Sequence, residues 1–212
     1  MDSYTQPHFN TSALITIDMQ NDFILDDGAS PVPGTRKVIP PLLDLLGTYR
    51  QHQLTILHVV RLYLRDGSNA ELCRRKVIEA GLEFVAPESK GAELVTALKP
   101  STSLRLDSEL LMAGEVQTIS EHEFILYKPR WGAFYGTQLN AFLQLHKVDT
   151  LVIAGCNYPN CPRTTLYEAS ERDYRLVVVT DALSQLYAKG EEEMRAIGAC
   201  LLSSEEIIER FS

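Results

Sequence analysis

One stretch decides the fold: Leu151-Val-Ile-Ala-Gly-Cys-Asn-Tyr-Pro-Asn-Cys-Pro-Arg-Thr-Thr-Leu-Tyr-Glu-Ala169. It begins with an apolar run of strand length, Gly155 ends that run, and Pro162 stands where the first turn of a helix tolerates proline. The pattern predicts a strand, a tight loop and a helix that begins beside Cys161. The free N–H groups and positive dipole at that helix start favour a thiolate at Cys161, although a cysteine taken alone is more often a small buried hydrophobe.

Length and composition limit the class of protein. A chain of 212 residues, 45% hydrophobic and 23% charged, fits a single domain over residues 1–212. The formal net charge of -8 argues against nucleic-acid binding, no apolar run could span a bilayer, and the N-terminus lacks a secretion signal. We therefore expect a cytoplasmic protein with four free thiols and no nucleic-acid or membrane partner.

Strands and helices alternate along the chain. Apolar runs predict six strands, and helical periodicity separates them. The six runs lie at residues 13–17, 54–60, 124–127, 150–154, 176–180 and 200–202. This order predicts an α/β fold, a three-layer α/β/α architecture with a six-stranded, mostly parallel sheet. Residues 1–12 read as an N-terminal arm, and residues 61–123 as a long insertion near the active-site edge that shapes a pocket, forms an oligomer contact or merely elaborates the surface.

Three predicted strands end in reactive side chains. Asp18 follows the first strand, Lys128 the third, and the loop with Cys161 the fourth. Parallel sheets bind ligands at the carboxyl ends of their strands, so the three groups are expected to meet. Asp18 alone could be a turn residue and Lys128 alone a solvated one, but together with Cys161 they indicate nucleophilic attack on an acyl carbon.

Other polar residues read as structural. No histidine follows a strand into this edge, so a Cys–His pair is not expected, and His58 is predicted to be a buried sheet residue. The basic triplet Arg74-Arg75-Lys76 is predicted to be a solvated helix face.

These motifs together resemble a known family. Asp18-Met-Gln-Asn-Asp-Phe23, Lys128 after a strand, and Gly155-x5-Cys161 before a threonine-rich helix are similar to the isochorismatase-like cysteine hydrolases, which include nicotinamidases, N-carbamoylsarcosine amidase and ureidoacrylate amidohydrolases. The resemblance covers residues 12–206. It implies a catalytic Asp-Lys-Cys triad, a small-molecule substrate and a homo-oligomer, either a dimer or a tetramer.

The resemblance also assigns the loop before the nucleophile. It implies a non-proline cis peptide between Cys156 and Asn157, a bond that costs roughly 3–4 kcal/mol. It further implies an oxyanion hole formed by the backbone N–H groups of Asn157 and Cys161.

The chain departs from the family pattern at two places. Val60-Arg-Leu-Tyr-Leu-Arg65 stands where nicotinamidases carry an Asp-x-His metal motif, so we expect no metal and no cofactor. Tyr158-Pro159 replaces a Thr-Asp or Thr-Asn pair, which places Tyr158 in the wall of the substrate pocket. Members that cleave isochorismate lack the cysteine, so Cys161 argues for amide chemistry.

Each of the remaining pocket predictions has an equally good alternative. Phe23 and Trp131 face the cleft or are core residues. Arg61 clamps a substrate carboxylate or forms a surface ion pair. The sequence thus predicts a cysteine hydrolase that cleaves a C–N bond of a small amide, ureide or carbamoyl compound through a thioester. The alternatives are an isochorismate-like vinyl-ether hydrolase and a non-catalytic small-molecule-binding protein on the same scaffold.

Overall fold

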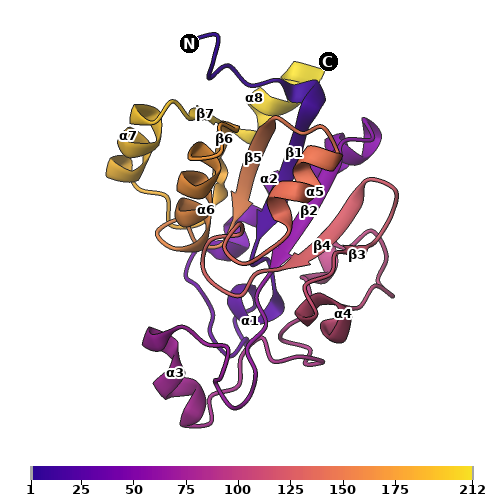
Figure 1. The fold of residues 1–212 in the computed structure, drawn as a ribbon, viewed down its shortest axis with the longest axis vertical. Helices are drawn as coiled ribbons and strands as arrows, with labels where there is room; N and C mark the ends of the chain where they lie inside the picture. The colour runs from indigo at the N-terminus through magenta and orange to yellow at the C-terminus, as the bar shows by residue number, and fades with distance from the viewer. Residues whose placement is uncertain (1, 212) are drawn as a thin grey trace.

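A computed structural model describes residues 2–211 and contains a seven-stranded sheet with helices on both faces (Figure 1). The strands are β1 (Ser12–Ile17), β2 (Thr55–Val60), β3 (Gln117–Thr118), β4 (Glu123–Tyr127), β5 (Thr150–Gly155), β6 (Arg175–Leu183) and β7 (Cys200–Leu202). Their order is β3-β4-β2-β1-β5-β6-β7, and every neighbouring pair is parallel except β3 with β4. The three-layer, mostly parallel architecture is confirmed.

The prediction of six strands was one short. The additional strand, β3, has two residues and pairs antiparallel with β4 at the edge of the sheet. A two-residue strand contains no apolar run, so sequence periodicity gives no signal for it.

The helices are α1 (Asn21–Ile24), α2 (Ile39–Gln51), α3 (Leu72–Glu79), α4 (Ser108–Met112), α5 (Leu139–Leu145), α6 (Cys161–Ser170), α7 (Ala188–Ala196) and α8 (Ser204–Ile208). Two outer layers cover the sheet, with α2 and α8 on one face and α5, α6 and α7 on the other. Because strand side chains alternate between faces, Leu14 packs in the cluster that includes residues of α2 and α8, and Ile15 in the cluster that includes residues of α5 and α6. The sheet is therefore buried on both faces.

The strand order reverses between β1 and β5. From β1 the sheet continues through β2 and β4 on one side, and through β5, β6 and β7 on the other. Gly155 closes β5 with φ at +119°, and a Cβ there would lie 2.3 Å from the carbonyl oxygen of Ile17, so only glycine fits. This close approach directs the following loop across the end of β1.

The two segments predicted to be irregular are largely ordered. In the N-terminal arm, His8 binds the Asp149 carboxylate at 2.7 Å, and the Thr11 hydroxyl donates to the same carboxylate at 2.7 Å. Ser12, the last residue of the predicted arm, already belongs to β1. Residues 61–123 contain α3, α4 and β3, and the last of them, Glu123, begins β4. In Figure 1, α1, α3 and α4 lie together at one end of the molecule, away from both termini.

A buried polar cluster fixes β4 beside β2. Glu123 accepts hydrogen bonds from Arg50 at 2.8 and 2.9 Å and binds His58 Nε2 at 2.8 Å. His58 Nδ1 binds the Thr16 hydroxyl at 2.8 Å, so His58 is a buried sheet residue as predicted. Burial alone raises the pKa of Glu123, but the hydrogen bonds and charges of His58 and Arg50 outweigh it and hold the pKa at about 2.

Glu123→Gln is expected to lower the free energy of unfolding at pH 7 by about 1–3 kcal/mol, because a charge-assisted acceptor is lost. The pKa of Glu123 is lower in the folded state than its ordinary value of 4.5. The stabilisation is therefore fully present above about pH 5.5 and is lost as the pH falls toward 2. Urea denaturation at pH 7 and pH 3 measures both effects. Glu121→Gln, at an exposed site, is the control, expected to change stability by less than about 0.5 kcal/mol. If Glu123→Gln loses as much free energy of unfolding relative to wild type at pH 3 as at pH 7, the assignment is wrong.

Candidate active site

Asp18 occupies a strained position at the carboxyl end of β1. Its φ is +53°, a left-handed conformation that only a few per cent of non-glycine residues adopt. Its N–H donates to the carbonyl of Val59 at 2.9 Å, which holds the strained residue against β2. Such strain persists only where the surroundings enforce it, and it is common at functional sites.

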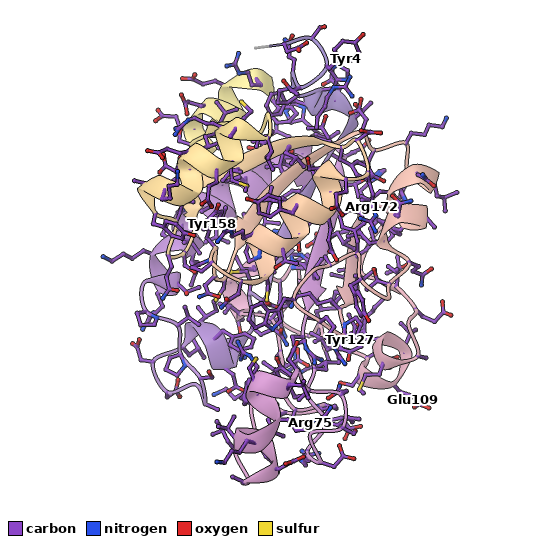
Figure 2. All side chains as sticks on the ribbon, turned by 60° about the vertical axis from the view of Figure 1, so that its left-hand side comes forward. Tyr4, Arg75, Glu109, Tyr127, Tyr158 and Arg172 are labelled. Atoms are coloured by element: carbon purple, nitrogen blue, oxygen red, sulfur yellow. The ribbon has the colours of Figure 1, made fainter. Side chains whose placement is uncertain are left out.

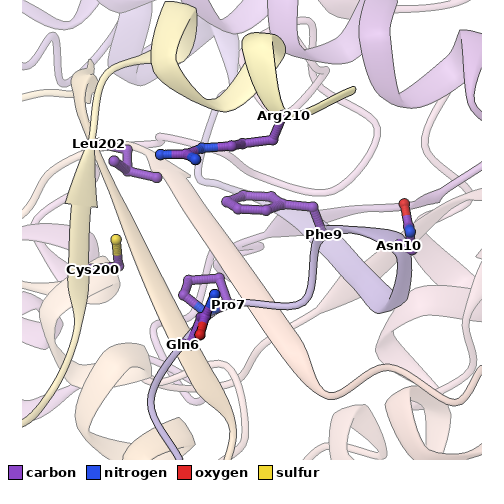
Figure 3. A pocket seen from close by; sticks show the side chains of 7 residues that line it. All are labelled: Gln6, Pro7, Phe9, Asn10, Cys200, Leu202 and Arg210. Atoms are coloured by element: carbon purple, nitrogen blue, oxygen red, sulfur yellow. The ribbon is translucent and has the colours of Figure 1, made fainter. Parts of the chain in front are cut away.

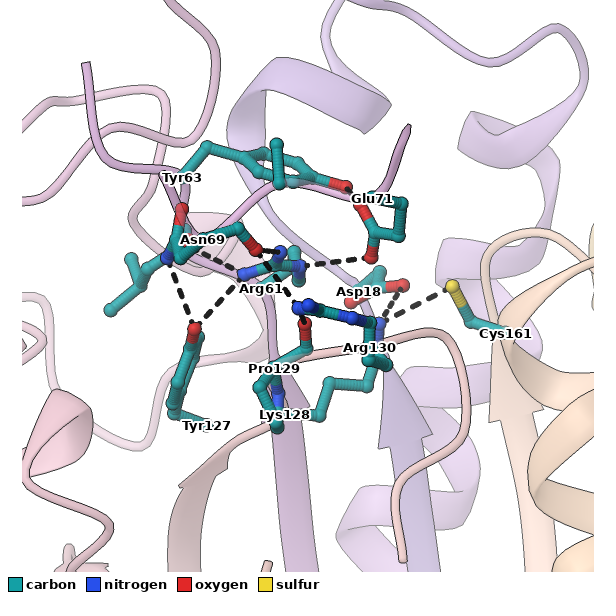
Figure 4. Close-up of polar contacts among 12 residues, drawn as sticks. Asp18, Arg61, Tyr63, Asn69, Glu71, Tyr127, Lys128, Pro129, Arg130 and Cys161 are labelled. Atoms are coloured by element: carbon teal, nitrogen blue, oxygen red, sulfur yellow. Dashed lines mark hydrogen bonds and ion pairs between the residues drawn. The ribbon is translucent and has the colours of Figure 1, made fainter. Parts of the chain in front are cut away.

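The structure brings together the three side chains predicted at the strand ends. The ammonium group of Lys128, 1% exposed, lies 3.0 Å from Asp18 Oδ2 and donates to Cys161 Sγ at 3.3 Å (Figure 4). All three side chains are buried. Lys128 thus lies between a carboxylate and a sulfur atom, as the order of the strands predicts.

Burial and charge decide the protonation states of this group. Burial lowers the pKa of Lys128, but the Asp18 carboxylate and the Cys161 sulfur outweigh it and leave the pKa above its usual value. Burial, followed by the negative charge of Asp18, raises the pKa of Cys161 to about 12. The expectation of a resting thiolate at Cys161 is therefore wrong: desolvation and the carboxylate outweigh the helix start and the lysine. A base is needed to activate the thiol.

Asp18 is placed to be that base. Its second carboxylate oxygen, Oδ1, is buried, and no donor within residues 2–211 forms a hydrogen bond to it. The oxygen that is not engaged by Lys128 is thus available to accept a proton.

The loop between β5 and α6 contains two backbone N–H groups without an acceptor among residues 2–211. Asn157 and Cys161 donate their backbone N–H groups to no acceptor in the part of the chain that the structure describes. The neighbouring N–H groups are used, since Tyr158 donates to the carbonyl of Ser184 at 2.9 Å and Asn160 to that of Asn157 at 3.1 Å. The two N–H groups predicted to form an oxyanion hole are therefore unoccupied.

The predicted cis peptide is wrong. Residues 2–211 contain no cis peptide bond, and the bond between Cys156 and Asn157 is trans. The loop reverses at Gly155, whose positive φ allows the turn, and the N–H of Cys156 donates to Ile17 at 2.8 Å. The trans form gives the loop its hydrogen bonds without the energetic cost of a cis bond.

A cavity of about 40 Å³ lies over the sulfur atom. It is lined by Asp18, Phe23, Ser30, Val32, Arg74, Cys156, Asn157 and Cys161. Phe23 was predicted here, whereas Arg74 was predicted to be a solvated residue of a helix face. The hollow opens to solvent on one side, so a ligand held over the sulfur atom can extend beyond it.

Arg61 lies behind the site rather than in the cavity. Its guanidinium donates to Glu71 at 3.4 Å, to the Asn69 carbonyl at 2.7 Å and to the Tyr127 hydroxyl at 3.1 Å (Figure 4). It also donates to the carbonyl of Leu62, and the residue is 2% exposed. Because protein acceptors occupy its donors, the prediction that Arg61 clamps a substrate is corrected to a structural role.

Tyr158 and Trp131 also lie outside the cavity. Tyr158 is fully buried beneath α7, where its hydroxyl donates to the carbonyl of Gly190 at 2.9 Å (Figure 2). Trp131 lines a separate groove of about 380 Å³ between Arg130 and α6. Of the four predicted pocket residues, only Phe23 lines the cavity over Cys161. The other three predictions were wrong because a short sequence motif shows neither how the core packs nor in which direction a loop runs.

Other hollows lack this combination of groups. A groove of about 470 Å³ near the amino end of β7 contains the Cys200 thiol and the Arg210 guanidinium but no carboxylate in its lining (Figure 3). Within residues 2–211 no three His, Cys, Asp or Glu side chains are grouped so that they could hold a metal ion. The same residues include no helix that is both long and apolar enough to cross a membrane.

Comparisons with known proteins identify the family of the chain. A family model described as the isochorismatase domain matches residues 12–206. A protein of Arabidopsis thaliana named probable inactive nicotinamidase is 34% identical over 198 residues, 90% of this chain and 91% of that protein. A solved isochorismatase family protein from Desulfovibrio vulgaris is 34% identical, with a TM-score of 0.80 over 94% of this chain and 97% of that one. N-carbamoylsarcosine amidase from Thermoplasma acidophilum is 25% identical, with a TM-score of 0.71 over 92% and 98% of the two chains.

Asp18→Asn is expected to make Cys161 more reactive toward iodoacetamide, because the charge that raises the pKa of the thiol is removed and asparagine tolerates the positive φ. The rate at pH 8 should rise at least about ten-fold. Peptide mass spectrometry in a Cys73→Ser background, which removes the exposed thiol, measures it. Alkylation that slows in the Asp18→Asn protein contradicts the assigned electrostatics.

Proposed function

The chain belongs to the isochorismatase domain family, and from that premise we propose that it is a cysteine hydrolase that cleaves a C–N bond of a small amide, ureide or carbamoyl compound. One observation carries the proposal: the Lys128 ammonium lies 3.0 Å from Asp18 and 3.3 Å from Cys161 at the carboxyl edge of the sheet. The similarity to N-carbamoylsarcosine amidase along 92% of the chain supports the class of bond.

In the first half of the proposed reaction, Asp18 accepts the proton of the Cys161 thiol as the sulfur attacks the substrate carbonyl carbon. The negative charge moves to the carbonyl oxygen, where the N–H groups of Asn157 and Cys161 donate to it. Lys128 remains protonated because its pKa is raised, and it balances the charge shared by Asp18 and the sulfur. The C–N bond then breaks, and the leaving nitrogen takes the proton from Asp18.

In the second half, water hydrolyses the thioester. Asp18 accepts a proton from the water while the water oxygen attacks the acyl carbon, and the C–S bond breaks. The sulfur then recovers that proton from Asp18, which restores the resting thiol. The acyl group leaves as an acid, and no redox partner or external base is required.

A non-catalytic binding protein is the second candidate. The raised pKa of the thiol and the Arabidopsis relative whose name includes the word inactive favour it. Under this alternative the buried triad stabilises the fold and never turns over. The two candidates differ in whether a thioester forms, so a turnover experiment decides between them.

Cys161→Ala is expected to lower ammonia release from small amides and ureides by at least about 10³-fold, because the nucleophile is lost. Asp18→Asn should reduce it similarly, by removing the base. Ammonia release over a panel of such compounds measures both. Cys200→Ala, the same change at a buried thiol outside the site, is the control and should remain within about three-fold of wild type. Full ammonia release by Cys161→Ala that still depends on Asp18 would instead indicate amide hydrolysis that does not use the cysteine.

A further inference from the structure

Arg74 places a positive charge in the cavity over Cys161 that no protein group neutralises. Among residues 2–211 its guanidinium forms no ion pair and no hydrogen bond, although it lines the same small cavity as Asp18 and Cys161. The arginines around it are engaged, since Arg61 donates to Glu71 and Arg130 to the carbonyl of Asn69. A guanidinium has five donors, so this residue retains its full capacity to bind an acceptor.

The nearby carboxylates are already occupied. Asp18 is paired with Lys128 at 3.0 Å, and the two charges cancel. Glu71, which precedes α3, binds Arg61 and accepts the Tyr63 hydroxyl hydrogen at 2.7 Å. The cavity therefore has an excess of one positive charge in a chain whose formal net charge is -8.

Two aromatic rings lie beside the Arg74 guanidinium. The central carbon of the Arg74 guanidinium lies 5.7 Å from the centroid of the Phe84 ring and 6.0 Å from that of Tyr63. Contacts at this distance attract a cation to the ring and leave its hydrogen-bond donors free. Arg74 thus lies beside two rings and has no counter-ion among residues 2–211.

We propose that Arg74 is a specificity-determining residue that binds the carboxylate of the substrate, so that the chain acts on small amides, ureides or carbamoyl compounds that carry an acid group. The planar guanidinium matches a carboxylate with two parallel hydrogen bonds. This assignment rests on the proposed hydrolase function for its substrate class.

The cavity also limits the distance between the two substrate groups. The scissile carbonyl must reach Cys161 while the carboxylate reaches Arg74, and both residues line the same cavity. The two groups are consequently joined by a short spacer. Phe23 and Val32 supply apolar walls for that spacer.

The test compares ligands that differ only in the acid group: N-carbamoylglycine with isobutylurea, and succinamate with 4-methylpentanamide. Their affinities are measured by calorimetry with the Cys161→Ala protein, which should not turn them over. At least one anion should bind about ten-fold or more tightly than its neutral partner, as expected for a bidentate charged pair. Adding Arg74→Gln should abolish that preference, and Arg74→Lys should restore part of it.

The control is Lys76→Gln, which removes the same charge from the exposed face of the same helix and should leave the preference unchanged. The proposal is overturned if no anion binds more tightly than its neutral partner, or if Arg74→Gln and Lys76→Gln reduce the preference equally. Because binding is measured without turnover, a loss of preference in Arg74→Gln together with no ammonia release by the wild type would reject the hydrolase function and keep the carboxylate site.

Discussion

The ion pair between Asp18 and Lys128 is the contact on which the rest of the site depends. A lysine that is 1% exposed keeps its charge only if an anion compensates for the lost hydration. Its partner follows β1, whereas Lys128 follows β4, and β2 lies between those strands. The pair therefore forms only when the three strands are in their observed parallel register, and Cys161 completes it from β5 on the other side of β1.

Other residues of the Asp18–Phe23 segment support this ion pair through hydrogen bonds. The side chain of Gln20 is fully buried, donates to the carbonyls of Arg61 and Ala92 at 2.8 and 2.7 Å, and accepts the N–H of Arg61 at 2.8 Å. Asp22 accepts the N–H of Val85. These contacts join the end of β1 to the end of β2 and to the insertion. Gln20 and Asp22 in this segment thus stabilise the structure around the Asp18 carboxylate.

The features predictable from the sequence are those with a local signal. Apolar runs mark where β1, β4 and β5 end, and parallel strands share an edge, so the meeting of Asp18, Lys128 and Cys161 is predictable from the sequence alone. The protonation state of Cys161 is not predictable in this way, because it depends on burial by residues distant in sequence. The path of residues 61–123 cannot be predicted from local sequence patterns either, because side-chain contacts such as that of Glu71 with Arg61 determine it.

Two arginines near the site differ in burial and in hydrogen-bond partners. Arg61 directly follows a strand and was the better candidate for a ligand, but a guanidinium 2% exposed must have its donors satisfied, and protein acceptors satisfy them. Arg74 stands in a basic triplet and is half-buried beside two rings, and its guanidinium has no acceptor among residues 2–211. Under the proposed function, the reactive groups lie on the ends of the strands and the cation that selects the substrate lies on the insertion. Substrate preference would then change with residues 61–123 while the sheet keeps its triad.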